Sequence, residues 1–221
     1  RTGGLKAGFG RADITPPPGL ALGGHGQAGR MSRGHRCRLY ARALALEDSA
    51  GERVVFVVAD MPWMSSILHR LTGARLLGKA LGVGTDRLIL SATHSHSGPG
   101  NFMDTEAYNE NGSAAPHYDP AMVEFLVERF TRAAAQALGD LQPARSAWGA
   151  RPVVGFTRNR SLGAFRLNDS LLTKADLKHE DRELQFEAVD PVWTMLRVDR
   201  CDAHWSNPTP LGALSFFAIH G

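Results

Sequence analysis

Seven stretches of the chain show the short apolar or alternating patterns that are typical of β-strands. They are residues 5–15, 36–48, 53–60, 87–94, 146–156, 190–200 and 211–220. Between the third and fourth stretches, residues 65–84 follow a helical period, which Gly82 and Gly84 bring to an end. The apolar stripe of this helix is expected to be Ile67, Leu68, Leu71, Leu76, Leu77 and Leu81. Strand, helix and strand over residues 53–94 predict a right-handed parallel crossover.

A second helix is predicted over residues 120–138. Asp119 is the candidate N-cap, Pro120 takes the first helical position and Gly139 follows the end. Its apolar face would be formed by Met122, Val123, Phe125, Leu126, Phe130, Ala133, Ala137 and Leu138. Residues 159–187 are polar and poorly periodic, and they predict a long surface excursion. Because the chain shows no repeat and no low-complexity linker, we expect one α/β unit over residues 1–221, a mixed sheet flanked by helices, with no internal boundary.

Composition mainly argues against certain classes of protein, namely nucleic-acid-binding and membrane-spanning ones. The 221 residues are 43% hydrophobic and 21% charged, as in an ordinary globular protein. The formal charge is +3 and the 25 lysines and arginines are scattered, which speaks against a nucleic-acid surface. No run of 18 apolar residues predicts a spanning helix. The first residues lack the apolar core of a signal peptide, although a processed secreted protein would look the same. Cys37 and Cys201 could be free thiols or a disulfide.

Three apolar runs end in a polar side chain that is capable of chemistry. "VVFVVAD" ends at Asp60, "LILSATH" at His94 and "LSFFAIH" at His220. In open α/β sheets the ligand crevice lies beyond the carboxyl ends of the strands. If the three strands are neighbours, their terminal side chains meet in one crevice, and the sequence therefore predicts a site there.

The stretch "LSATHSHSGPG" places His94 and His96 one residue apart at the end of a strand. In an extended chain, residues i and i+2 face the same side, so both imidazoles could point into one site. Imidazole is a common zinc ligand, and catalytic zinc sites use about three protein ligands and an open position. The alternative is that polar residues merely end the strand. His220 alone is more typical of a hydrogen-bonded core histidine, and it becomes a candidate ligand only as a partner for His94.

Other segments carry weaker indications. The glycine-rich residues 19–35 lack a phosphate-binding motif and are interpreted as a flexible rim over a pocket. In "TRNRSLGAF", Arg160 could stabilise an oxyanion or simply pair with a surface acid. Phe102 and Met103, after the Gly-Pro-Gly turn, are candidates for the wall of an acyl-chain groove.

Taken together, the motifs resemble those of the neutral/alkaline (non-lysosomal) ceramidase family. "GRADITPP" is similar to the opening strand of that family, and "GRMSRGHRCRLYARAL" to the segment that follows. "SATHSHSGPG" resembles the family's Thr-His-Thr-His-Ser-Gly-Pro-Gly motif, which is the most specific of these. "NRSLGAF", "AVDPVWTMLRV" and "FFAIH" resemble later segments in the same order. Serine replaces the motif's second threonine, and "GGH" replaces the usual Gly-Tyr of the rim loop.

The resemblance implies a zinc-dependent amidohydrolase that cleaves ceramide (N-acylsphingosine) to a fatty acid and sphingosine. It implies that His94 and His220 are ligands of Zn²⁺, that His96 lies beside the metal, and that Arg160 faces the reacting carbonyl. Asp60 is then either an acceptor that fixes the tautomer of a ligating histidine or a strand-end cap. We expect a lipid-like N-acyl substrate, peripheral membrane contact and no nucleic acid, and the oligomeric state stays open. The resemblance favours a secreted or periplasmic location.

The chain departs from the family pattern at its end. It stops after His220 and Gly221, whereas the family's remaining zinc ligands, a glutamate and a tyrosine, and an active-site serine come later. We therefore expect the N-terminal part of a ceramidase-like catalytic domain. Two alternatives remain: a hydrolase of the same fold that acts on another N-acyl amide or ester, and a non-catalytic lipid-binding domain.

Overall fold

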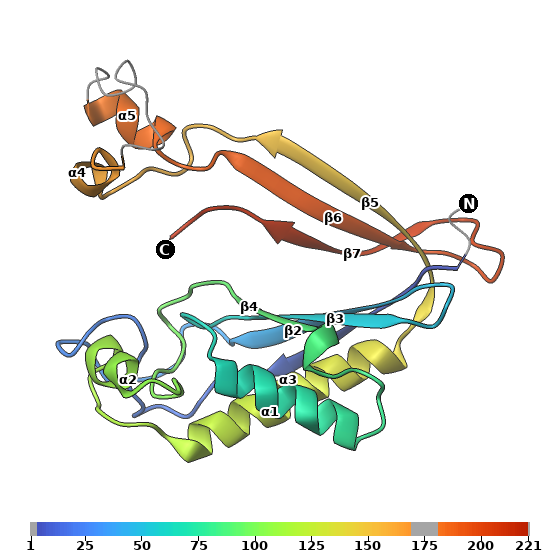
Figure 1. The fold of residues 1–221 in the computed structure, drawn as a ribbon, viewed down its shortest axis with the longest axis horizontal. Coiled ribbons are helices and arrows are strands. Elements are labelled where there is room, and N and C mark those ends of the chain that lie inside the picture. The colour runs from blue at the N-terminus through green and yellow to red at the C-terminus, as the bar shows by residue number, and fades with distance from the viewer. Residues whose placement is uncertain (1–3, 169–180, 221) are drawn as a thin grey trace. The chain divides into compact units, whose positions relative to one another are not determined.

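The computed structural model describes residues 4–168 and 181–220, which form a mixed sheet with helices (Figure 1). The strands are β1 (Lys6–Asp13), β2 (Tyr40–Glu47), β3 (Arg53–Ala59), β4 (Leu88–Ala92), β5 (Gln142–Pro152), β6 (Val192–Arg200) and β7 (Thr209–Phe216). The helices are α1 (Ser66–Gly78), the 3₁₀ turn η1 (Thr85–Arg87), α2 (Glu106–Gly112), α3 (Pro120–Gly139), α4 (Leu162–Phe165) and α5 (Asp181–Glu187). The hydrogen-bonded order of the strands is β4-β3-β2-β1-β5-β6-β7.

Contacts divide the chain into two compact units, although the sequence predicted no internal boundary. The first unit comprises the residues up to 145 together with 199–210, and the second comprises 146–198 and 211–220. The three crossing points lie inside β5, β6 and β7. Because continuous strands rather than linkers connect the units, no shift in composition marks the division.

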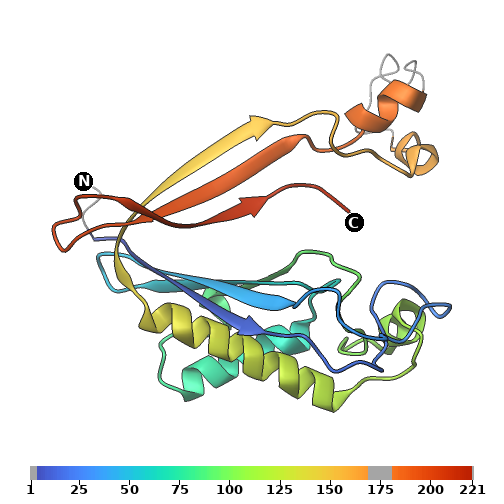
Figure 2. The ribbon, with the colours of Figure 1, turned by 180° about the vertical axis from the view of Figure 1, so that it is seen from behind.

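In the first unit, α1 and α3 lie against one face of the strands β1 to β4 (Figure 2). Alternate residues of β3 point into this layer, and Val55 and Val57 are completely buried. The α3 backbone approaches β1 very closely, because a Cβ on Gly10 would lie 2.1 Å from the carbonyl oxygen of Ala133. The core of the molecule therefore lies between the sheet and α3, and it fixes where the strand ends emerge.

Helix α3 and the β3–β4 pair agree with the sequence prediction. The helix begins at Pro120 and ends at Gly139, one residue beyond the predicted end. Its N-cap is Asp119, whose Oδ1 accepts hydrogen bonds from the amides of Ala121 (2.9 Å) and Met122 (3.1 Å). The strands β3 and β4 pair in parallel, as the strand–helix–strand pattern required.

Helix α1 differs from its predicted stripe. It ends at Gly78. Leu68 and Leu76 of the stripe are buried as predicted, but Leu71 and Leu77 are 41% and 56% exposed. The buried face is instead centred on Gly73, where a Cβ would lie 2.6 Å from Cγ2 of Thr85. Close packing of Gly73 against Thr85, the first residue of η1, thus sets which part of the predicted stripe is buried.

The second unit contains most of β5, β6 and β7, together with α4 and α5. The strand predicted over residues 146–156 begins earlier, at Gln142, and ends at Pro152. The predicted excursion over 159–187 contains α4 and α5, and its residues 169–180 lie outside the described part. Large apolar side chains are exposed in this unit, namely Trp148, Val154, Phe156, Leu167, Val192, Trp193, Phe216 and Ile219. Within the described residues, every helix is too short or too polar to cross a membrane.

Candidate metal and catalytic site

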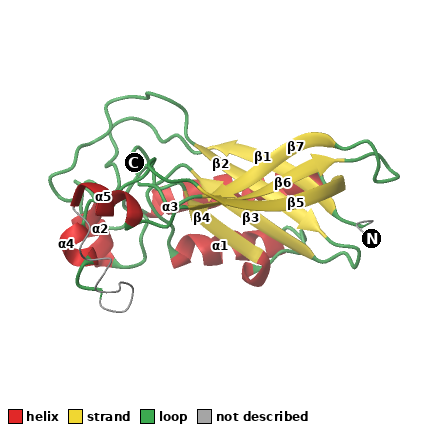
Figure 3. Ribbon diagram, turned by 90° about the horizontal axis from the view of Figure 1, so that it is seen from above, coloured by secondary structure: helices red, strands yellow, loops and turns green. Residues whose placement is uncertain are grey.

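The candidate site is built on the turn that follows β4. The strand ends at Ala92, and the amide of Thr93 still donates to the carbonyl of Ala59 on β3 at 3.0 Å. His94 then adopts a left-handed backbone conformation with φ 59°. The extended backbone expected for this histidine is therefore absent, and a turn, not strand alternation, brings the side chains of His94 and His96 together. Helix α2 lies beyond the strand ends in the same unit (Figure 3), and so does the loop of residues 19–35, drawn in blue in Figure 1.

Each of the two imidazoles has one nitrogen on a backbone carbonyl. Nδ1 of His94 lies 2.5 Å from the carbonyl oxygen of Pro62, and Nδ1 of His96 lies 3.0 Å from that of Gly24. A carbonyl oxygen can only accept, so each Nδ1 must carry the proton. In the neutral rings both Nε2 atoms then hold lone pairs, and these two atoms are 3.3 Å apart.

This arrangement fits a shared cation. Two facing lone pairs repel one another unless a proton or a metal ion lies near both. Two nitrogens bound to one tetrahedral zinc ion at about 2.0–2.1 Å would be ~3.3 Å apart, the same as the observed separation. The rings are nearly perpendicular, at 88°, and both residues are partly buried. The pair suits a metal ligand beside a second ligand or a proton acceptor.

Asp60 follows β3, and within the described residues its carboxylate is bonded to Tyr40 and Arg42, not to a histidine. Its Oδ2 accepts from the amide of Tyr40 at 2.9 Å and from Nη1 of Arg42 at 2.8 Å. These contacts agree with the alternative that Asp60 caps the end of a strand, because its carboxylate joins the end of β3 to β2. The backbone carbonyl of Pro62 takes the place that was considered for Asp60, as the acceptor that fixes the His94 ring.

The glycine-rich loop is anchored on the histidine motif. The amide of Gly23 donates to the carbonyl of Gly98 at 3.0 Å, and that of Gly24 donates to Gly112 at 2.7 Å. His25 on this loop places Nε2 3.0 Å from the carbonyl oxygen of His96. Nothing in the local sequence pattern around His25 indicates a partner 71 residues away.

Arg160 and His220 belong to the second unit, and both are exposed. The neighbouring Asn159 anchors the Arg160 segment, because its amide donates to Gln185 (2.6 Å) and its Nδ2 to Ala188 (2.9 Å). His220 follows β7. The roles of these two side chains at the histidine pair stay predictions.

The structure corrects two expectations from the sequence, the adjacency of the three strands and the groove wall at Phe102, and it decides the state of the two cysteines. Strands β3 and β4 are neighbours, but β7 stands at the opposite end of the strand order, so the three strands do not form the expected adjacent set. Phe102 is fully buried against Trp63, at 6.3 Å between ring centroids, and cannot line an open groove. Cys37 and Cys201 are both free thiols.

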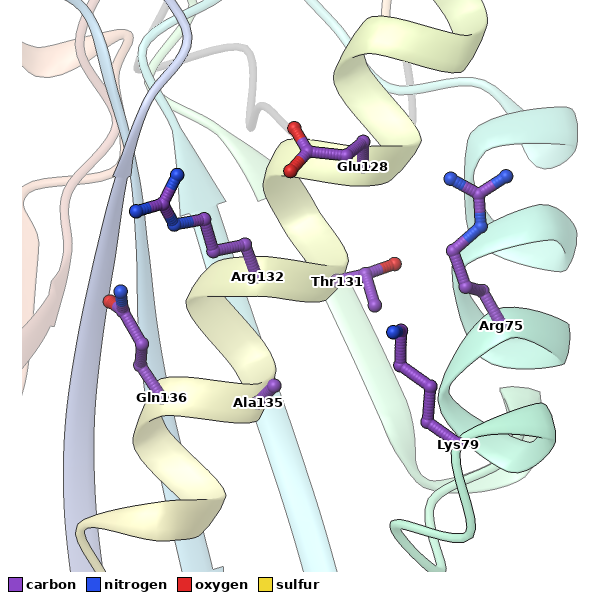
Figure 4. A pocket seen from close by; sticks show the side chains of 7 residues that line it. All are labelled: Arg75, Lys79, Glu128, Thr131, Arg132, Ala135 and Gln136. Carbon is purple, nitrogen blue, oxygen red and sulfur yellow. The ribbon is translucent and has the colours of Figure 1, made fainter.

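A separate hollow lies between α1 and α3, and Figure 4 shows its lining. Arg75 reaches it from α1 and Lys79 from the C-cap of that helix, and Glu128 and Arg132 reach it from α3. Glu124, outside the lining, holds Arg75 by two bonds of 2.8 Å. The lining contains none of the predicted site residues, so the histidine pair remains the candidate site.

Comparison with known proteins gives a consistent result. Residues 5–221 match the family described as neutral/alkaline non-lysosomal ceramidase, N-terminal. The neutral ceramidase of Pseudomonas aeruginosa is 30% identical over 219 residues, which cover 97% of this chain and 30% of that protein. The neutral ceramidase of Mycobacterium tuberculosis is 28% identical, covering 98% of this chain and 32% of that protein.

The fold leads to the same family. The crystal structure of neutral ceramidase from Pseudomonas aeruginosa superposes with a TM-score of 0.81 at 28% identity, covering 98% of this chain and 32% of that one. The chain thus spans 30–32% of the length of these relatives. From the match over residues 5–221 and the shared fold, the chain belongs to the family of neutral/alkaline non-lysosomal ceramidases, to its N-terminal part.

Proposed function

We propose that this chain is the N-terminal part of a zinc-dependent hydrolase that cleaves the N-acyl amide of ceramide to a fatty acid and sphingosine. The observation that carries the proposal is the His94–His96 pair, whose Nε2 atoms converge to 3.3 Å with both Nδ1 atoms on carbonyls. Such a pair suits a divalent cation bound to His94 with a proton acceptor, His96, beside it, and it lies in the segment "THSHSGPG". The relatives that match the chain are named neutral ceramidases.

His94 would hold the metal through Nε2, while the Pro62 carbonyl keeps its Nδ1 protonated and its ring in place. His220 would supply a second ligand, an assignment that rests on the family resemblance. Bound zinc would polarise the substrate carbonyl and lower the pKa of a bound water toward about 7. Further ligands are needed, because two imidazoles are fewer than the roughly three protein ligands of a catalytic zinc site.

His96 would take up the proton of the attacking water. Its Nε2 carries the lone pair that a general base requires, and it faces the same side as Nε2 of His94. Arg160, an exposed cation on the second unit, would offset the negative charge that develops on the substrate oxygen. Both residues act on the substrate or its water, so we assign them catalytic roles.

A lipid substrate also requires access to a membrane or micelle surface. We propose peripheral membrane contact through the second unit, where Trp148 and Phe156 are 62% and 81% exposed. These exposed side chains also favour the rival proposal that the domain binds a lipid without cleaving it. A third possibility is hydrolysis of another N-acyl amide or ester at the same site.

Zinc content and hydrolysis of the full-length gene product test the proposal. We expect His94→Ala to lose both bound zinc and amide cleavage. His117→Ala is the matched control, because His117 is an exposed histidine of the same unit that contacts Glu106 at 3.1 Å, and it should retain both. Zinc retained by His94→Ala would refute the ligand assignment.

A panel of ceramide, other N-acyl amides and esters separates the alternatives. Preferred cleavage of ceramide supports the proposal, and preferred cleavage of another substrate supports the related hydrolase. Stoichiometric zinc with lipid binding but without turnover of any substrate would favour the non-catalytic domain.

A further inference from the structure

We propose that residues 23–25, here called the rim segment, are a positioning element that holds His96 in a single tautomer with its Nε2 lone pair toward His94. The catalytic meaning of this element rests on the proposed function. The tautomer itself follows from contacts within the first unit, so it can be tested without any hydrolysis.

The first contact fixes the proton on the His96 ring. Its Nδ1 lies 3.0 Å from the carbonyl oxygen of Gly24, which can only accept. The N–H must therefore be at Nδ1, and the lone pair of the neutral ring is at Nε2. Since Nε2 faces Nε2 of His94 at 3.3 Å, the Gly24 carbonyl decides which nitrogen of His96 is presented to the site.

In the second contact the ring belongs to the rim segment and the backbone carbonyl belongs to His96. Nε2 of His25 lies 3.0 Å from the backbone carbonyl of His96, so this nitrogen must be the donor. The two rings meet edge to face, with centroids 5.4 Å apart and planes at 70°. The rim segment thus holds both the ring and the backbone of His96, and His25 takes the tautomer opposite to that of His96.

Steric fit makes Gly24 specific to this role. Its φ is +89°, and a Cβ there would lie 2.3 Å from Nδ1 and 2.4 Å from Cε1 of the His96 ring. Any other residue would strain the backbone and push the ring away. The amides of Gly23 and Gly24 are bonded to Gly98 and Gly112, so the segment cannot readily retreat.

These contacts matter because a proton acceptor must present its lone pair at a defined place. Rotation of the His96 ring about its Cβ–Cγ bond would exchange Nδ1 and Nε2 for ring carbons and remove the lone pair from the site. The Gly24 bond opposes this rotation, and by the usual strength of one hydrogen bond it favours the held state by about 2- to 10-fold.

Nitrogen NMR of the histidine rings in the metal-free chain tests the proposal directly. We expect His96 to show one tautomer, with the proton on Nδ1, and His25 to show the opposite one. Gly24→Ala should convert His96 to a mixture or to the Nε2–H form. Gly26→Ala is the matched control, because Gly26 also has a positive φ (+69°) but its Cβ would meet only Asn111 O, at 3.7 Å.

Variants of His25 test the second contact without backbone strain. His25→Ala should loosen the His96 ring and shift its tautomer ratio by at least about 2-fold. His25→Gln, which can still donate to the His96 carbonyl, should restore the ratio. His35→Ala, an exposed histidine of the same loop, should leave it unchanged. A wild-type His96 protonated on Nε2, or a tautomer ratio that Gly24→Ala and His25→Ala do not change, would overturn the proposal.

Kinetics of the full-length gene product separate this proposal from the proposed function. If hydrolysis occurs, Gly24→Ala should lower kcat about 10- to 100-fold with little change in KM, as expected when the support of an active-site histidine is lost. A single Nδ1–H tautomer in a protein that cleaves no amide would support the positioning element and refute the hydrolase. A kcat that Gly24→Ala leaves unchanged, although the tautomer shifts, would refute the catalytic meaning of the element.

Discussion

Glu47 should contribute to the pH dependence of the stability of the first unit, and Glu47→Gln should remove this contribution. Glu47 ends β2, and it lies directly opposite Lys6 on β1 and Arg53 on β3 in the strand register. Its Oε1 accepts from Nζ of Lys6 at 2.8 Å and its Oε2 from Nε of Arg53 at 2.7 Å. One carboxylate, whose side chain is 8% exposed, therefore links three strands at one end of the sheet.

The magnitude follows from these contacts. A hydrogen bond to a charged group contributes about 1.5–3 kcal/mol, against about 0.5–1.5 kcal/mol for a neutral one. Glutamine would keep the shape but lose the charge on both bonds. Lys6 and Arg53 are 44% and 37% exposed, so solvent weakens the effect. We expect Glu47→Gln to lower the free energy of unfolding by about 1–2 kcal/mol at neutral pH.

The sign of the pH dependence is determined by the direction of the pKa shift. The hydrogen bonds from Lys6 and then Arg53 lower the pKa of Glu47 in the folded chain below its ordinary value. Between the folded and unfolded pKa values, the unfolded state binds more protons. The stabilisation is therefore complete above the unfolded pKa of about 4.3, and it is lost as the pH falls through the folded pKa.

Urea unfolding followed by circular dichroism, at neutral and acidic pH, measures both effects. The difference between the wild type and Glu47→Gln should be largest at neutral pH and should shrink in acid. Glu124→Gln is the matched control: Glu124 also bonds an arginine twice, but its side chain is 62% exposed, so its replacement should have the smaller effect. Equal losses in the two variants, or a difference that persists in acid, would refute this reasoning.

Two further changes test how α3 is held. Asp119→Ala removes the cap of the first two free amides and should lower the free energy of unfolding by about 1 kcal/mol; Asp119→Asn, which can still accept, should lower it less in the same urea titration. Phe130→Ala empties a fully buried site between α3 and the sheet and should lower it by about 3–5 kcal/mol. Phe125→Ala, at a partly buried position, should lower it less, and an equal loss would place the core elsewhere.

The elements that could be predicted from the sequence are those whose signals are local. The Asp119–Pro120 start of α3 and its apolar face depend on residues within one helix, and both agree with the structure. The buried face of α1 depends also on Gly73 meeting Thr85, a contact between segments, so the leucine spacing placed Leu68 and Leu76 correctly but not Leu71 and Leu77. Strand order is equally non-local, which is why β7 could not be placed relative to β4.

At the candidate site, the two histidines could be predicted from the sequence, but the hydrogen-bond acceptors that orient their rings could not. His94 and His96 stood out because two imidazoles, one residue apart, follow a predicted strand and precede a Gly-Pro-Gly turn. The acceptors that orient them are the carbonyls of Pro62 and Gly24, and every residue has a carbonyl, so the sequence holds no trace of this role. His25 was missed for the related reason that its partner is a backbone oxygen far along the chain.

The backbone of His94 gives an independent reason to regard this turn as functional. A left-handed conformation costs a non-glycine residue about 1–2 kcal/mol, and glycine would adopt it freely. The turn itself therefore gains nothing from a histidine at φ 59°. What the histidine adds is an imidazole whose Nδ1 reaches Pro62 and whose Nε2 faces His96, so the strain is offset only through that side chain. It follows that His94→Gly should stabilise the turn while it removes the proposed metal ligand, the combination expected if this histidine serves the site and not the turn.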